Sequence, residues 1–181
     1  MSTNYPYNPL SYSYGSVTRP KIFVSYHHAS NQHWYDAFSQ IFGTYYEVIT
    51  DTSLDRQIDS DNSDYVKRAI REKNITGSSV TIVLCGQETH KRRWVDWEIE
   101  MTLKKKHALL GIMLTSCARN FQNEYIIPDR LLDNINSGYA SWIDWTNSPQ
   151  VLMSAIAEAK DRAGYTSRID NHRPAMQRSK S

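Results

Sequence analysis

Residues 79–99 read SVTIVLCGQETHKRRWVDWEI, and the beginning of this stretch decides the fold. Residues 79–85 are rich in β-branched and apolar side chains, contain no charge, and are bounded by Gly77 and Gly86. A strand without a polar face is buried on both sides, as the strands of a parallel sheet are. The stretch therefore predicts a central strand of a parallel sheet.

Shorter patterns on both sides of this strand alternate between strand and helix. Trp34, Phe38, Ile41 and Phe42 recur at helical spacing behind Ser30, which we expect to cap that helix. The other expected elements are strands at residues 21–26, 46–49, 108–114 and 139–143, and helices at 61–73, 92–106 and after residue 149.

Strands that alternate with helices predict an α/β fold. We expect a five-stranded, mostly parallel sheet with helices on both faces, in the flavodoxin-like strand order that right-handed crossovers favour. Residues 115–138 are polar and show no periodicity, so we expect an irregular connection there.

The two ends of the 181-residue chain differ from its middle. We expect a flexible leader at residues 1–20, one domain at residues 21–165, and a basic, solvated tail at residues 166–181. The ends carry the basic surplus of a chain whose net charge is only +2, so the domain itself is slightly acidic. This distribution argues against a nucleic-acid-binding face.

Several other classes of protein are disfavoured by composition. No apolar run reaches the roughly 18 residues of a membrane helix, and no signal-like apolar segment opens the chain, so we expect a cytoplasmic protein without a membrane partner. Two cysteines, Cys85 and Cys117, are too few for a disulfide scaffold.

Three polar segments follow strands of the expected sheet, at the edge where parallel sheets bind ligands. These segments are residues 26–28, the acidic loop 51–61, and residues 86–94. The first and third lack the aspartates of a response-regulator receiver, and the chain has no Walker or GxGxxG loop. His27, His28 and His33 have no HExxH or cysteine partners, so we expect no metal site.

Trp94 and Glu98 are the strongest functional signal. Four residues apart on a helix, they lie on one side, beside a core-facing stripe of Val95, Ile99 and Thr102. Glu98 thus lies at the border of the buried face and close to the expected ligand-binding edge. The spacing alone also fits an exposed glutamate beside a packing tryptophan.

Residues 21–158 resemble TIR (Toll/interleukin-1 receptor) domains, in particular the bacterial TIR-like proteins of antiphage defence. The resemblance rests on the first strand, Ile22 to Tyr26, on the strand before Cys85, and above all on the Arg92-Arg93-Trp94-Val95-Asp96-Trp97-Glu98-Ile99 helix. In enzymatic TIR domains a Trp-x-x-x-Glu arrangement on this helix carries the catalytic glutamate, which Glu98 matches.

The resemblance implies cleavage of the nicotinamide–ribose bond of NAD, which is a substrate here rather than a cofactor. Glu98 would then stabilise the ribosyl cation, and Trp94 would pack beside the nicotinamide, with Tyr26 or His27 on the opposite wall. Arg92 and Arg93 lie where the helix dipole disfavours cations, so we expect phosphate contacts or plain solvation.

The resemblance further implies a signalling product. Capture of the ribosyl cation by water gives ADP-ribose, and capture by an internal nucleophile gives a cyclic isomer, to be read by a separate effector protein. Self-assembly is a second implied interaction. The alternative is a TIR-like interaction module without catalysis that assembles through its helix faces and loop 51–61.

Overall fold

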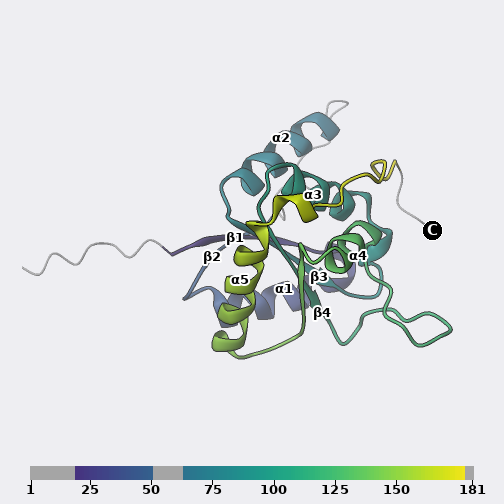
Figure 1. The fold of residues 1–181 in the computed structure, drawn as a ribbon. Coiled ribbons are helices and arrows are strands. Elements are labelled where there is room, and N and C mark those ends of the chain that lie inside the picture. Colours follow the sequence, from purple (N-terminus) through teal and green to yellow (C-terminus); the bar gives the residue numbers. More distant parts are fainter. Residues whose placement is uncertain (1–18, 51–62, 178–181) are drawn as a thin grey trace, which may run out of the picture.

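A computed structural model describes residues 19–50 and 63–177 (Figure 1). Within these residues five strands form one sheet in the order β2-β1-β3-β4-β5, and every neighbouring pair is parallel. The strands are β1 Lys21–Ser25, β2 Glu47–Ile49, β3 Val80–Cys85, β4 Ala108–Met113 and β5 Ser141–Asp144. The flavodoxin-like α/β fold predicted from the alternating pattern is confirmed.

Helices cover both faces of the sheet (Figure 1). They are α1 His28–Phe42, α2 Ser63–Thr76, α3 Arg93–Lys104, α4 Asp129–Asn136 and α5 Pro149–Ala163. Helices α1 and α5 pack on one face, and α3 and α4 pack on the other. Helix α2 lies beside α3.

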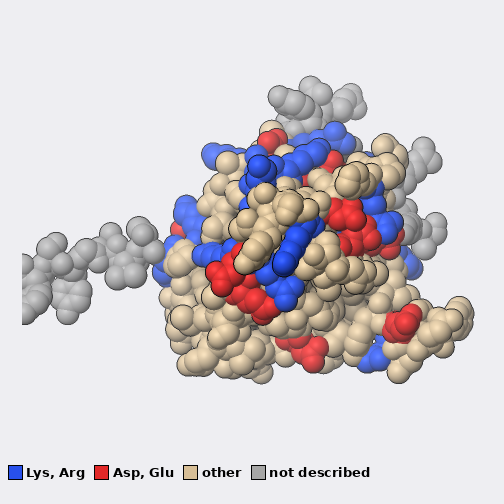
Figure 2. All heavy atoms as spheres, viewed as in Figure 1, with Lys and Arg blue, Asp and Glu red and all other residues tan. Residues whose placement is uncertain are grey.

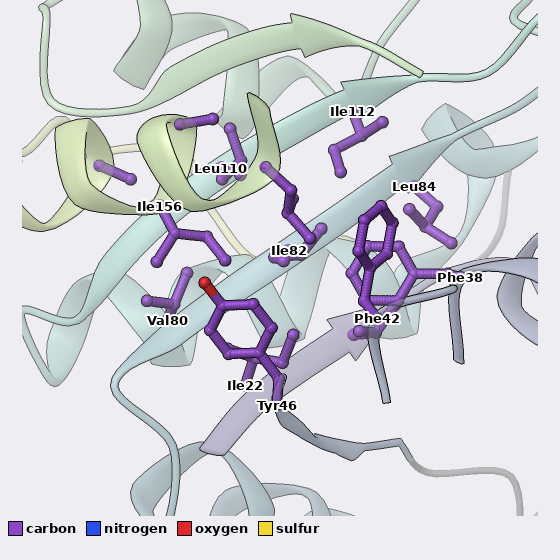
Figure 3. Close-up of a cluster of buried hydrophobic side chains, with 14 of the residues drawn as sticks. Ile22, Phe38, Phe42, Tyr46, Val80, Ile82, Leu84, Leu110, Ile112 and Ile156 are labelled. Carbon is purple, nitrogen blue, oxygen red and sulfur yellow. The ribbon is translucent and has the colours of Figure 1, made fainter. Parts of the chain in front are cut away.

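The core on the α1 and α5 face is built from alternate residues of the strands (Figure 3). Val80, Ile82 and Leu84 of β3 point into it, where they meet Phe38 of α1 and Ile156 of α5. The neighbouring residues Val83 and Cys85 belong to the opposite cluster. Strand β3 is therefore buried on both faces, as its sequence predicted.

The second cluster positions α3. Val95, Ile99 and Leu103 are buried against the sheet and against Leu131 of α4. Thr102, the polar member of the stripe, forms a hydrogen bond with Thr81 of β3, with 2.7 Å between the hydroxyl oxygens. The predicted core-facing stripe of α3 is confirmed, and it fixes the direction of every other side chain on this helix.

Two local predictions were wrong. Helix α1 begins at His28 rather than behind Ser30, and the Ser30 hydroxyl instead contacts His27 Nδ1 at 2.9 Å. Residues 115–138 contain helix α4, where the sequence predicted only an irregular connection. This helix is followed by Gly138, whose φ of 80° is the left-handed conformation that ends many helices.

The chain after α5 also differs from the expectation of a solvated tail. Residues 169–177 lie against α3 and α4 and form hydrogen bonds with buried side chains there. The Arg130 guanidinium donates to Asn171 Oδ1 at 2.6 Å, and the backbone N–H of Met176 donates to Asp96 Oδ2 at 3.0 Å. The leader 1–18, the acidic loop 51–62 and residues 178–181 lie outside the described residues.

Figure 2 shows basic and acidic side chains next to one another across this view of the molecule. The ion pairs of the described residues include Arg162–Glu158 and Lys105–Glu72. Among the described helices, none is both long enough and apolar enough to cross a bilayer.

Candidate active site

Glu98, in the second turn of α3, is the centre of a buried polar cluster. Its carboxylate accepts a hydrogen bond from Ser25 Oγ at 2.5 Å and an ion-paired one from Arg71 Nε at 3.1 Å. The Glu98 residue is 4% exposed and Arg71 is 1% exposed. Each carboxylate oxygen thus has its own donor, which is what a buried charge requires.

Three separate elements bring these side chains together. Ser25 is the last residue of β1, and its place in the register beside Val83 points it toward the α3 side of the sheet. Glu98 lies on the side of α3 that faces α2, and Arg71 reaches it from α2. The cluster therefore lies at the carboxyl end of the central strands, where parallel sheets bind ligands.

Trp94 lies one turn before Glu98 and is partly exposed. Two guanidinium groups contact its indole ring: Arg71 Cζ lies 4.1 Å and Arg93 Cζ 4.8 Å from the ring centroid. Such cation–π contacts stabilise a planar cation on an aromatic face. The predicted neighbourhood of Trp94 and Glu98 is present, and the structure adds a guanidinium that contacts both.

The loop between β3 and α3 is held by one hydroxyl group. Thr89 Oγ1 accepts hydrogen bonds from the Gly86 N–H at 2.9 Å and from Asn31 Nδ2 at 3.1 Å, and it donates to the Leu84 carbonyl at 3.1 Å. A Cβ at Gly86 would lie 2.4 Å from the amide oxygen of the buried Asn31, so a larger residue would displace that hydrogen-bonded side chain. This network fixes the start of α3.

His27 lies near Arg92, the residue just before the first turn of α3. Burial first, and then the positive charge of Arg92, hold the pKa of His27 below its ordinary value. Arg92 precedes the first residue of α3 and donates to Glu88 Oε2 at 2.7 Å, and Arg93 begins the helix. The predicted phosphate contacts of Arg92 and Arg93 stay predictions.

Tyr26 lies on the other face of the sheet. It is 4% exposed, belongs to the α1 core, and stacks on Tyr35 with ring centroids 4.8 Å apart. Its hydroxyl donates to Gln32 Oε1 at 2.9 Å. The predicted contact of Tyr26 with substrate gains no support from this position, and Ser25 is the β1 residue that reaches Glu98.

Ser25 and Arg71 were missed by the reasoning from sequence. A polar residue that ends a strand of otherwise buried residues, as Ser25 does, is a usable signal. Arg71 gives no such signal, because arginines on helices are mostly exposed.

A separate cavity of about 230 Å³ lies on the α4 side of α3. Asp96, His90 and Arg92 line it together with Arg173 and Met176 of the C-terminal segment. In the part of the chain that the structure describes, no three His, Cys, Asp or Glu side chains gather as metal ligands do.

An all-parallel sheet in the order β2-β1-β3-β4-β5, with a Trp-x-x-x-Glu helix at its carboxyl edge, is consistent with the flavodoxin-like fold of the TIR class. Within that class, the family model of the Thoeris protein ThsB, TIR-like domain, matches residues 23–119, and the chain belongs to this family. No curated protein sequence matches the chain. Membership of the family supports a role in antiphage defence.

Proposed function

We propose that the chain is an enzyme that cleaves the nicotinamide–ribose bond of NAD, with Glu98 as its catalytic residue. The observation that carries the proposal is a carboxylate held at the carboxyl edge of the sheet, one turn after a partly exposed tryptophan. Family membership adds support, because the match includes the whole Trp94–Glu98 segment.

The chemistry suits one fixed carboxylate. The bond between C1′ of the ribose and the nicotinamide nitrogen breaks, and its electron pair leaves with the nicotinamide, which becomes neutral. Positive charge develops on the ribose as an oxocarbenium ion, which an adjacent carboxylate stabilises. Ser25 donates to Glu98 Oε2 and so orients the carboxylate.

The second half of the reaction decides the product. Attack by water on C1′ releases a proton and gives ADP-ribose, and attack by an adenine nitrogen or a ribose hydroxyl releases a proton and gives a cyclic isomer. We favour a cyclic product that a separate effector protein reads, with self-assembly of this chain as part of activation. The proposal places the enzyme in the cytoplasm, with NAD as substrate and no resident cofactor.

The substitution Glu98→Gln tests the catalytic role. It keeps the side-chain shape and removes the charge, so nicotinamide release should fall about 10²–10³-fold, as when one transition-state-stabilising group is lost. The measurement is mass spectrometry of nicotinamide and ADP-ribose isomers from infected cells and from purified protein incubated with NAD.

Glu100→Gln is the matched control, because Glu100 lies on the same helix and pairs with the exposed Lys104. It should leave product formation at the wild-type level. Wild-type output from a folded Glu98→Gln variant contradicts the proposal.

The second candidate is a TIR-like interaction module without catalysis. The observation that favours it is the Arg71–Glu98 ion pair itself, because a carboxylate that already has a guanidinium partner can serve structure alone. In that case Glu98→Gln preserves antiphage protection without nucleotide product, while surface substitutions in loop 51–61 abolish protection.

A further inference from the structure

Arg71 contacts both members of the Trp94–Glu98 pair. Its Nε donates to Glu98 Oε1 at 3.1 Å, and its Cζ lies 4.1 Å from the centroid of the Trp94 ring. The side chains of Arg71 and Glu98 are 2% and 6% exposed, so the ion pair is shielded from water. The guanidinium is thus a planar cation on an aromatic face, bound to a carboxylate.

The nicotinamide ring of the proposed substrate resembles the Arg71 guanidinium in charge and shape. The nicotinamide ring of NAD is also a planar, delocalised cation, and the proposed reaction needs it beside Trp94 and its ribose beside Glu98. The two cations require the same aromatic face and the same negative charge. One carboxylate cannot stabilise a developing ribosyl cation fully while a guanidinium neutralises it.

We propose that Arg71 is an internal competitor of NAD, which holds the site closed until its guanidinium leaves Glu98 and Trp94. This inference rests on the proposed function and adds its regulation. Because the Arg71 side chain is buried, its release requires a new rotamer together with a shift of α2 relative to α3. A ligand that binds only the open state has an apparent affinity reduced by the fraction of molecules that are open.

Arg71→Lys and Arg71→Gln test the inference. Lysine keeps a charge for Glu98 but loses the planar stacking on Trp94, and glutamine loses both interactions. We expect the KM for NAD and the Kd of carba-NAD, an analogue that cannot be cleaved, to fall in the order wild type, lysine, glutamine. If about one wild-type molecule in ten is open, the glutamine variant gains about tenfold in affinity.

Glu72→Gln is the matched control. Glu72 is the next residue of α2, and its exposed ion pair with Lys105 also joins α2 to α3, with 3.2 Å between the charged atoms. Its loss should leave the KM and the Kd unchanged, because this pair does not touch Glu98 or Trp94. A gain in affinity confined to the Arg71 variants therefore reports on the site rather than on looser helix packing.

The remaining outcomes are distinct. If Arg71→Gln does not fold because Glu98 is left as an unpaired buried charge, the charge-preserving lysine variant decides the question. Unchanged or weaker binding in the folded Arg71 variants, or a lower kcat at constant KM, overturns the inference and makes Arg71 a support for Glu98. If neither wild type nor variants bind carba-NAD or release nicotinamide, the proposed function fails as well.

Discussion

Two buried arginines contact α3, one from each neighbouring helix. Arg71 of α2 pairs with Glu98, and Arg130 of α4 pairs with Asp96, two residues earlier. Arg130 is fully buried and binds both oxygens of the Asp96 carboxylate, at 3.0 and 3.3 Å. The helix that carries the candidate catalytic residue therefore has a buried ion pair on each side.

The buried Asp96–Arg130 ion pair predicts that a conservative substitution of Asp96 lowers the free energy of unfolding strongly. Asp96→Asn leaves the Arg130 guanidinium buried without a counter-charge, and breaking a buried ion pair in this way costs about 3–5 kcal/mol. The free energy of unfolding, measured by urea titration with tryptophan fluorescence, should fall by that amount. Lys104→Gln, which breaks an exposed pair on the same helix, should cost about 0–1 kcal/mol. Equal urea midpoints for the two variants contradict the prediction.

Single residues also show how far sequence reasoning reaches. Trp94 and Glu98 are neighbours because of helical spacing, which is local and can be predicted. Arg71 and Ser25 are 27 and 73 positions away from Glu98, and only the packing of α2 and β1 against α3 brings them to it. Helical spacing alone therefore could not predict that Arg71 is the charged partner of Glu98.

Among the strands and α-helices of the described residues, α4 is the one that sequence reasoning missed. It has only eight residues, and two of its buried positions are the polar Arg130 and Asn134, so its apolar pattern is broken. Pro128 and Asp129 at its start and Gly138 after its end were the remaining signals. These signals were not sufficient to predict the helix. Arg130 and Asn134 can be buried because the C-terminal segment supplies hydrogen-bond partners for both side chains.

The contact between α4 and residues 169–177 is specific. Asn134 Nδ2 donates to the Asp170 carbonyl at 2.6 Å, and the Asp170 N–H donates back to Asn134 Oδ1 at 3.0 Å. Arg173 forms an ion pair with Asp133 at the surface of the same helix. This reciprocal pairing is the kind of contact by which a strand binds its neighbour, made here by a side-chain amide.

Truncation after Arg168 tests this contact. The shortened chain loses the two hydrogen bonds between Asn134 and Asp170 and two acceptors of Arg130. Four hydrogen bonds at about 0.5–1.5 kcal/mol each predict that the free energy of unfolding falls by about 2–6 kcal/mol. Truncation after residue 177 is the control, because it keeps all of these contacts. Thermal midpoints from circular dichroism distinguish the two, and equal midpoints contradict the prediction.

For the whole molecule, topology was the most predictable property. The continuous apolar run of β3 and the regular alternation of elements are sufficient to predict a parallel sheet, and right-handed crossovers leave few strand orders. The position of the site follows from the same rule, because all carboxyl ends of the strands lie at one edge. The ends of the elements differ from the predicted ones by a few residues, as fraying and capping lead one to expect.

The stability of the whole fold should depend on pH through two histidines. Burial is the first cause that lowers the pKa of His27 and of His107 in the folded protein below the ordinary 6.5. The positive charge of Arg92 adds to the effect at His27, and that of Lys105 adds to it at His107. As the pH falls below 6.5 the unfolded chain takes up protons before the folded one does, so the stability present above this value is lost. The thermal midpoint should therefore be lower near pH 5.5 than near pH 7.5.

Substitution of these histidines gives the check on that prediction. His107→Gln should reduce the loss of thermal stability between the two pH values, and His33→Gln, at an exposed position, should not change it. An identical loss in wild type and His107→Gln contradicts the assignment to His107.

The cluster of Ser25, Arg71 and Glu98 also has a consequence for the timing of biosynthesis. Its members belong to β1, α2 and α3. The contact with the largest sequence separation joins Ser25 and Glu98, which are 73 residues apart in the chain. Contacts of such sequence separation form late, after the loops between them have closed. A nascent chain on the ribosome therefore holds no assembled carboxylate cluster until α3 has emerged and docked. If the proposed activity consumes a metabolite that the host itself needs, every copy is inert until α3 has docked during synthesis.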